Sequence, residues 1–282
     1  MLKRVLNHCL LLLAVLVTLS SCKPEFEKVR ASGNDDLIYK KAFEYYDKQE
    51  YFKAQTLFEQ IINKYRGKEG AEKLYYTYAY THYKMNNFIL ASYYFKNFAN
   101  TFYNSQWREE AMYMSAVCNY QLSPTYRLDQ SYTTKAIDEL QSFVNMFPES
   151  TRVDSANTLI DACRYKLERK AFGEANLYFD LQNYQSAVTS FENLLKDYPE
   201  TNDAERIRYL ICESDYLLAE NSIYEKQEER YQETLNKIEE FKLKYPKSKY
   251  LKDLGELGKD SRNRIKDLKN ERHQIESTRG GS

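Results

Sequence analysis

The chain has 282 residues, with 41 basic and 41 acidic side chains, 8 glycines and 3 histidines. This balanced charge lacks the basic excess that binds nucleic acid, so we expect no nucleic-acid partner. Two of the histidines, His82 and His273, are far apart, and no glycine-rich phosphate loop occurs, so we expect no metal, no cofactor and no enzymatic activity.

The first 21 residues have the features of an export signal. Lys3 and Arg4 precede a short apolar run at residues 10–17, and small residues lie directly before Cys22. The run is too short to cross a bilayer, which takes about 20 apolar residues. We therefore predict a signal peptide over residues 1–21 that is absent from the mature protein.

The sequence Leu19-Ser20-Ser21-Cys22 resembles a bacterial lipobox. The resemblance implies that Cys22 becomes the first mature residue and carries covalent lipid, palmitate included. Several acyl chains anchor a protein stably, since each buried methylene contributes roughly 0.8 kcal/mol. The alternative is an ordinary secretory signal with an incidental cysteine. Lys23 stands where an aspartate would favour inner-membrane retention, so we expect the outer membrane and its periplasmic face, although Glu25 and Glu27 leave the other face open.

Residues 22–36 form the predicted link between the anchor and the folded part. The segment is polar and contains Pro24, Ser32 and Gly33, which predicts a flexible tether. Its 14 residues after Cys22 would span roughly 20 Å as a random coil. Asn34 or one of the two aspartates after it can cap the first helix.

A pattern with a small residue at its centre occurs five times between residues 37 and 248. The positions four, seven and eleven residues after the small residue are apolar or aromatic in every repeat, and these offsets mark one face of an α-helix. In the last three repeats a proline then ends the helix. The small residues are Ala54, Ala91, Ala136, Ala187 and Thr234.

A second small residue lies upstream of each of these, on the first helix of a pair. It is twelve residues away in three repeats and twenty in the third and fifth, which predicts eight extra residues in both of those turns. The upstream residues are Ala42, Ala79, Ala116, Ala175 and Ser214. The pattern predicts an all-α, tetratricopeptide-like solenoid of about five helix pairs, at residues 37–66, 71–104, 106–150, 152–201 and 203–248.

The C-terminal segment continues the helical pattern. An amphipathic helix that caps the last pair is predicted over residues 249–275, because apolar residues recur there on a charged background, namely Leu251, Leu254, Leu257, Ile265 and Leu268. Residues 276–282 are predicted to be disordered. Charged runs such as Lys237-Ile238-Glu239-Glu240 are interpreted as solvated helix faces. Three cysteines remain in the mature helices and are predicted to be buried thiols, namely Cys118, Cys163 and Cys212.

The lipobox, the tether and five tetratricopeptide pairs together resemble the BamD family, lipoproteins of the outer-membrane β-barrel assembly machinery. The resemblance covers nearly all of residues 22–250. The chain departs from the family at Tyr65-Arg66 and Phe102-Tyr103, where a proline is usual. The more specific matching segments are Tyr78-Ala79-Tyr80, Met112-Tyr113-Met114, residues 124–130 and residues 196–201 followed by Arg206.

The resemblance implies a scaffold that is not an enzyme. Its N-terminal pairs would receive unfolded outer-membrane proteins, and its C-terminal pairs would dock on the periplasmic domains of a BamA-like barrel subunit, beside other subunits of the machine. Arg206 is implied to contact the barrel subunit. The alternative is a tetratricopeptide scaffold for peptidoglycan or division proteins.

Aromatic residues on the first helices of the first three pairs form the candidate client-binding site. In tetratricopeptide arrays such positions tend to face the concave groove, where they would hold an extended peptide with bulky side chains. The same rings can instead pack between neighbouring first helices, and both alternatives stay open. The candidate residues are Tyr39, Phe43, Tyr46, Tyr76, Tyr80, Tyr83, Tyr113 and Tyr120.

Overall fold

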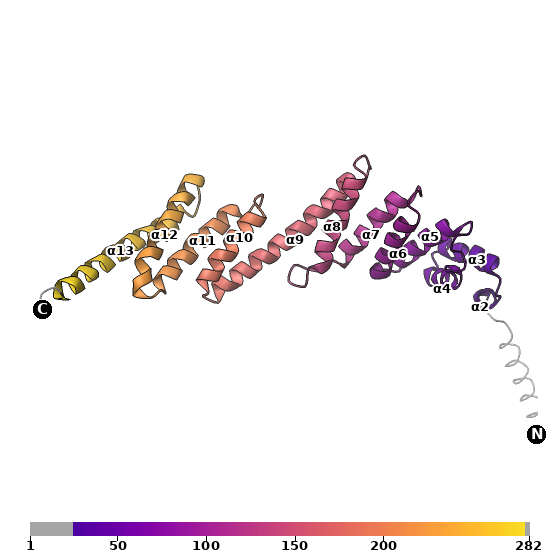
Figure 1. Cartoon of the computed structure of the whole chain (residues 1–282), viewed down its shortest axis with the longest axis horizontal. Coiled ribbons are helices and arrows are strands. Elements are labelled where there is room, and N and C mark those ends of the chain that lie inside the picture. The colour runs from indigo at the N-terminus through magenta and orange to yellow at the C-terminus, as the bar shows by residue number, and fades with distance from the viewer. Residues whose placement is uncertain (1–24, 280–282) are drawn as a thin grey trace, which may run out of the picture. The chain divides into compact units, whose positions relative to one another are not determined.

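The computed structural model describes residues 25–279, with side chains up to Ile275, so the predicted signal peptide and Cys22 lie outside it. Within the described residues the chain forms twelve α-helices and no strand, which confirms the all-α prediction. None of these helices is long and apolar enough to cross a membrane. In chain order (Figure 1) they are α2 (Glu25–Arg30), α3 (Asp35–Asp47), α4 (Tyr51–Ile61), α5 (Ala71–Lys84), α6 (Phe88–Thr101), α7 (Arg108–Leu122), α8 (Ser131–Met146), α9 (Val153–Asp180), α10 (Tyr184–Asp197), α11 (Ala204–Glu220), α12 (Tyr224–Lys244) and α13 (Leu251–Arg279).

The chain folds as two compact units whose boundary lies within α9, between Cys163 and Arg164. In the first unit each helix from α2 to α8 packs against the next, and the first part of α9 adds Ala156 and Ile160 to the core. In the second unit the last part of α9 adds Ala175 to the core of α10 and α11, while α13 packs against both α11 and α12. Consecutive packing of helix pairs with a final covering helix is the predicted solenoid arrangement.

The small residues of the repeat pack in the core, as the sequence predicts. All ten of them are 0% exposed. Short side chains leave room for the large ones of facing helices, and close packing then fills the space between pairs. The residues four positions after the small residue of each second helix are 0–1% exposed; they are Phe58, Phe95, Leu140, Phe191 and Ile238.

The extra residues of the third and fifth repeats take different forms. In the third repeat they form the loop of residues 123–130 between α7 and α8, as predicted. In the fifth repeat the prediction of a long turn is wrong, because only residues 221–223 separate α11 from α12. Residues 224–230 contain neither proline nor glycine, so they extend α12 at its start, to a length of 21 residues.

The predicted tether over residues 22–36 is also partly wrong, because residues 25–30 form α2. Val29 is 5% exposed, and the Phe26 ring meets the edge of Tyr45 with 5.7 Å between centroids. These two apolar side chains lie three residues apart on one helical face, which favours docking on α3. Asn34 caps α3 as expected, since its Oδ1 accepts the Leu37 N–H at 3.0 Å.

The end of the chain departs from the prediction as well. The backbone of α13 stays helical to Arg279, so the predicted disorder over residues 276–282 is wrong for its first four residues. The amphipathic face of α13 accounts for its start: Leu254 is 0% exposed and Leu268 is 7% exposed. The helix therefore continues beyond the segment that the apolar pattern marks.

Ion pairs join successive second helices within each unit. In the first unit Lys96 Nζ of α6 lies 2.8 Å from Glu139 Oε1 of α8. In the second unit Lys237 Nζ of α12 lies 2.6 Å from Glu192 Oε1 of α10. Both pairs join the residue five positions after one small residue to the residue three positions after the next, and their charges are reversed. We call them the cross-repeat ion pairs.

In both units, side chains of the intervening first helix also contact the cross-repeat ion pair. Ser115 and Asn119 of α7 donate hydrogen bonds to Glu139 Oε2, at 2.9 and 2.7 Å. Asp215 of α11, which is 5% exposed, lies with Oδ2 2.9 Å from Lys237 Nζ. Lys237 is therefore half-buried between two acids, and the interpretation of its charged run as a purely solvated face is wrong at this residue.

His82 on α5 is fully buried between two tyrosine rings. The centroid distances are 4.6 Å to Tyr78 and 5.1 Å to Tyr94, and neither imidazole nitrogen has a hydrogen-bond partner within the described residues. Burial lowers the pKa of His82 below its ordinary value of 6.5, against a smaller opposite effect of the Glu59 carboxylate. Burial therefore favours the neutral form of this imidazole in the native protein.

We expect acid to destabilise the first unit through His82. Below about pH 6.5 the unfolded chain binds a proton that the folded chain does not, so the stability present above this pH falls as the pH drops toward the folded pKa. Thermal melting from pH 7 to pH 5 should show a smaller loss of Tm for His82→Phe than for the parent. His273→Gln, at an exposed histidine of α13, is the matched control; an unchanged pH slope for His82→Phe would contradict the prediction.

Candidate protein-binding surface

The eight candidate client-binding residues lie on α3, α5 and α7 of the first unit, and every one of them is partly buried. Partial burial means that each ring packs against protein and also keeps an accessible surface. The contacts of each repeat decide how far the rings can form one surface. Those contacts differ from repeat to repeat.

In the first repeat the three aromatic side chains pack against residues of their own repeat and of the loop that follows it. The Tyr39 ring stacks on Tyr65 at 5.0 Å and 19°, and its hydroxyl donates to Gly70 O at 3.3 Å. Gly70 has a φ of +80°, and a Cβ there would lie 2.9 Å from the Tyr39 hydroxyl oxygen, so only glycine fits. Phe43 meets Phe58 edge-on at 5.0 Å. Tyr46 likewise meets Tyr51, with 5.6 Å between centroids.

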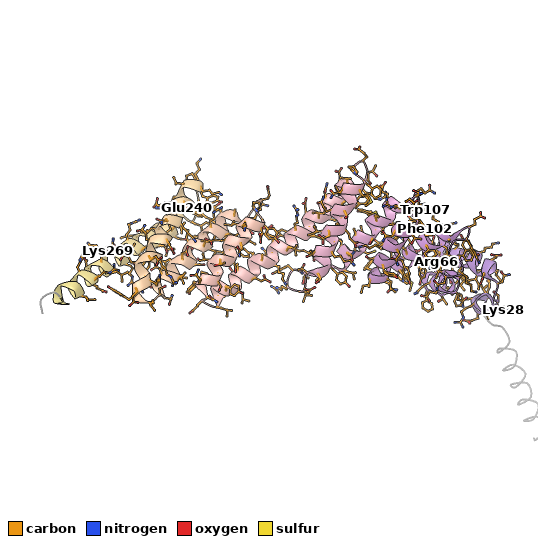
Figure 2. All side chains as sticks on the ribbon, viewed as in Figure 1. Lys28, Arg66, Phe102, Trp107, Glu240 and Lys269 are labelled. Carbon is orange, nitrogen blue, oxygen red and sulfur yellow. The ribbon has the colours of Figure 1, made fainter. Side chains whose placement is uncertain are left out.

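In the second repeat the rings form a continuous cluster. Tyr76 stacks on Trp107 at 5.1 Å and 18°, and Tyr80 meets Phe95 edge-on at 4.9 Å and 87°. Tyr76 and Tyr80 also contact each other, with 5.0 Å between centroids. Trp107, labelled with Phe102 in Figure 2, is the chain's one tryptophan and precedes α7. We call Tyr76, Tyr80 and Trp107 the aromatic cluster.

Charged groups hold the aromatic cluster in place. The Tyr80 hydroxyl donates a hydrogen bond to Glu110 Oε1 of α7. Glu110 Oε2 lies 3.3 Å from the Arg152 guanidinium, which also lies 6.0 Å over the ring of Tyr113. Burial raises the pKa of Tyr76 to about 12, and burial followed by the bond to Glu110 raises the pKa of Tyr80, so both phenols stay protonated. The hydroxyls therefore act as neutral hydrogen-bonding groups.

The remaining candidates extend this surface less directly. Tyr83 meets Phe88 edge-on at 5.6 Å, and Tyr113 packs at 5.4 Å on Phe143. Tyr120 lies partly buried near the end of α7. The structure thus brings Tyr76 and Tyr80 together with Trp107, which the sequence pattern did not select, and leaves Tyr46 packed within its own repeat.

Arg206 lies in the second unit, on the exposed side of α11. Its guanidinium carbon lies 4.9 Å from the centroid of the Phe172 ring of α9, a cation–π contact. Among the described residues no carboxylate pairs with it. Its donors therefore remain available to an anionic group on another protein.

The cysteines of the described helices are buried. Cys118, Cys163 and Cys212 are buried thiols, as predicted, and burial raises the pKa of Cys118 and of Cys212 to about 12. Thiols with such pKa values are not nucleophiles near neutral pH. The part of the chain that the structure describes holds no group of histidine, cysteine or acidic side chains suited to a metal.

Comparison with known proteins gives one family match. The model of the family described as "YfiO: Outer membrane lipoprotein" matches residues 32–228. No curated protein sequence matches the chain. Among solved structures, the tetratricopeptide domain of P58(IPK) has 15% identity and a TM-score of 0.41, covering 91% of this chain and 72% of that one. Rap protein complexed with competence and sporulation factor has 11% identity and a TM-score of 0.35, covering 84% and 75%.

Proposed function

Because this chain belongs to the YfiO family of outer-membrane lipoproteins, which is the BamD family, we propose that it is a lipid-anchored scaffold of the β-barrel assembly machinery. The match over residues 32–228 is the observation that carries the proposal, since it spans most of the helical array. The protein holds unfolded outer-membrane proteins, docks on a BamA-like barrel subunit beside the other subunits, and performs no catalysis of its own.

The anchor in this proposal is covalent lipid on Cys22, at the periplasmic face of the outer membrane. The packing of α2 on α3 supports a close attachment. Three peptide links from Cys22 to Glu25 reach at most about 10 Å when fully extended, which is less than the average span of roughly 20 Å expected for the predicted tether as a random coil. The first helix pair would then lie next to the bilayer surface.

The client site in this proposal is centred on the aromatic cluster. Rings fixed by stacking and by the Tyr80–Glu110 hydrogen bond lose little conformational entropy when they bind a bulky side chain. Aromatic faces accept aromatic side chains of many sequences, as a scaffold with varied clients requires. The same rings also pack between α5 and the start of α7, so the surface is rigid before a client arrives.

We expect loss of two rings of the aromatic cluster to weaken client binding at least a few-fold. The double variant Tyr76→Ala, Tyr80→Ala removes two ring contacts of about 0.5–1.5 kcal/mol each. The measurement is fluorescence anisotropy with a labelled peptide of alternating bulky residues and an aromatic C-terminus. Tyr165→Ala, at a 60% exposed tyrosine of the second unit, is the matched control. Equal affinity of a double variant that circular dichroism shows to be folded would place the client site elsewhere.

Docking through Arg206 is tested on the native complex. We expect Arg206→Glu to reduce the amount of barrel subunit that co-purifies from membranes, because it reverses a charge at the contact. Arg262→Glu, at an exposed arginine of α13, makes the same change away from that surface. Equal recovery with both variants would refute the role of Arg206. Recovery of a peptidoglycan or division protein instead of a barrel subunit would favour the alternative scaffold function.

A further inference from the structure

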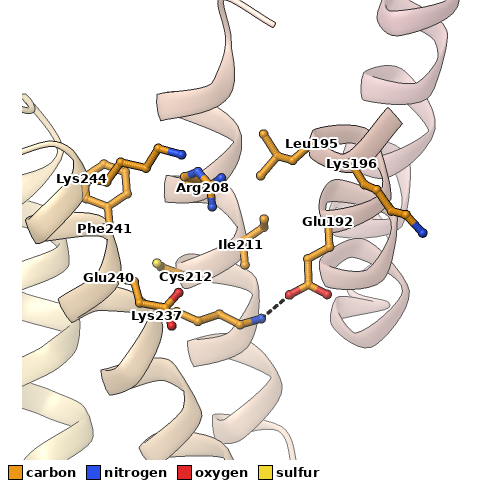
Figure 3. A pocket seen from close by; sticks show the side chains of 10 residues that line it. All are labelled: Glu192, Leu195, Lys196, Arg208, Ile211, Cys212, Lys237, Glu240, Phe241 and Lys244. Carbon is orange, nitrogen blue, oxygen red and sulfur yellow. Dashed lines mark hydrogen bonds and ion pairs between the residues drawn. The ribbon is translucent and has the colours of Figure 1, made fainter. Parts of the chain in front are cut away.

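A pocket of about 420 Å³ lies between α10, α11 and α12 of the second unit (Figure 3). Leu195, Ile211 and Phe241 form its apolar wall. Phe241 and the neighbouring Lys244 lie beyond residue 228, where the family match ends. The pocket therefore includes residues of α12 that lie outside the family match, and it belongs to the second unit, whereas the aromatic cluster belongs to the first.

One end of the pocket is neutralised by the protein itself. Lys237 Nζ bridges Glu192 of α10 and the buried Asp215 of α11, at 2.6 and 2.9 Å, and Figure 3 shows the bridge to Glu192 across the pocket. Two carboxylates around one ammonium leave no positive charge to recruit a ligand at this end. The Lys237 bridge instead fixes the distance between α10 and α12.

The other end carries positive charge without an internal partner. Arg208 Nε is buried and has no acceptor within the described residues, and neither Arg208 nor Lys244 forms an ion pair there. In Figure 3 the ammonium end of Lys244 extends toward the Arg208 guanidinium. Two cations line this end of the pocket, and a buried donor without an acceptor destabilises the fold. An anion at this end would offset the positive charge of both side chains.

Two cationic side chains at one end and an apolar wall beside them determine which ligand the pocket can bind. We propose that this pocket binds an acidic side chain of a partner protein together with an adjacent apolar side chain. The carboxylate accepts from Arg208 and Lys244, and a guanidinium offers the planar fork that suits a carboxylate. The apolar neighbour packs on Leu195, Ile211 and Phe241. The site is independent of the proposed client surface and of Arg206.

The probe is a fluorescein-labelled peptide with blocked ends and the core Asp-Leu-Glu-Phe, titrated against the full mature chain. The double variant Arg208→Gln, Lys244→Gln should bind it at least tenfold more weakly than the parent does. Lys244→Gln alone changes an exposed side chain, so it keeps the test valid if the double variant fails to fold; it should lose severalfold. The control Lys247→Gln, Lys252→Gln removes the same charge at exposed positions outside the pocket and should bind as the parent does.

Two further peptides separate charge from apolar packing. The isosteric core Asn-Leu-Gln-Phe tests the carboxylates, and Asp-Ser-Glu-Ser tests the apolar side chains; both should bind at least tenfold more weakly. Equal binding of the amide peptide, equal loss in the control variant or no saturable binding to the parent would overturn the proposal. So would binding to vesicles of anionic phospholipid that depends on Arg208 and Lys244 while the peptide does not bind.

Discussion

Cys22→Ser should release nearly all of the protein from the outer membrane while leaving its helical array intact. The substitution removes the thiol to which lipid would be attached, and every acyl methylene withdrawn from the bilayer costs roughly 0.8 kcal/mol of anchoring. None of the described helices is long and apolar enough to span a membrane. The measurement is the protein's distribution between membrane pellet and soluble periplasm.

The fractionation is done in cells depleted of the barrel subunit, because docking would otherwise retain the unlipidated protein. Lys23→Ser, next to the same site, controls for a general effect of sequence changes near the cleavage point. Unchanged sedimentation of Cys22→Ser under these conditions would exclude lipid on Cys22 as the anchor. Circular dichroism of the released protein should match that of the parent.

The second large effect concerns stability. Ala187 is 0% exposed and packs with Phe191, Ala175 and Ile207 in the core of the second unit. Ala187→Leu adds three carbons where there is no space, and overpacking of this kind costs typically 1–3 kcal/mol or more. We expect a lower midpoint in urea unfolding with little change in slope.

The control for this substitution lies on the same helix. Gln185→Leu adds a leucine on the exposed side of α10, where the expected change in the free energy of unfolding is within about 0.5 kcal/mol. A parent-like midpoint for Ala187→Leu would mean that α10 does not cross its neighbours at this residue. Ala91→Leu makes the equivalent test in the first unit, where Ala91 is 0% exposed.

The repeat was predictable because its signal is local. Offsets of four, seven and eleven residues specify one helical face, and a small residue among large ones marks the crossing. The errors arise where the decisive contact is distant or weak. Two apolar residues, Phe26 and Val29, are too few to mark a helix until α3 supplies the surface that buries them. The first residues of α12, 224–230, lie outside the repeat pattern, and they are helical because their side chains favour a helix.

The candidate site shows the same limit. The sequence pattern selects Tyr76 and Tyr80 by their spacing, but Trp107 lies outside the repeat register and contacts Tyr76 only through the packing of α5 and α7. A lone tryptophan just before a predicted helix is the one signal that could have drawn attention to it. In the sequence Arg208 and Lys244 look like ordinary surface charges. Only the structure shows that neither forms an ion pair with the described residues.

The reversed polarity of the cross-repeat ion pairs bears on how the chain avoids misassembly during folding. Proteins built of similar helix pairs can join the wrong neighbours, because every pair presents a related apolar face. If α6 met α12, Lys96 would face Lys237, and if α10 met α8, Glu192 would face Glu139. Each mistaken pairing sets like charges opposite each other, which disfavours it. The reversed polarity of two ordinary ion pairs thereby disfavours these two wrong pairings.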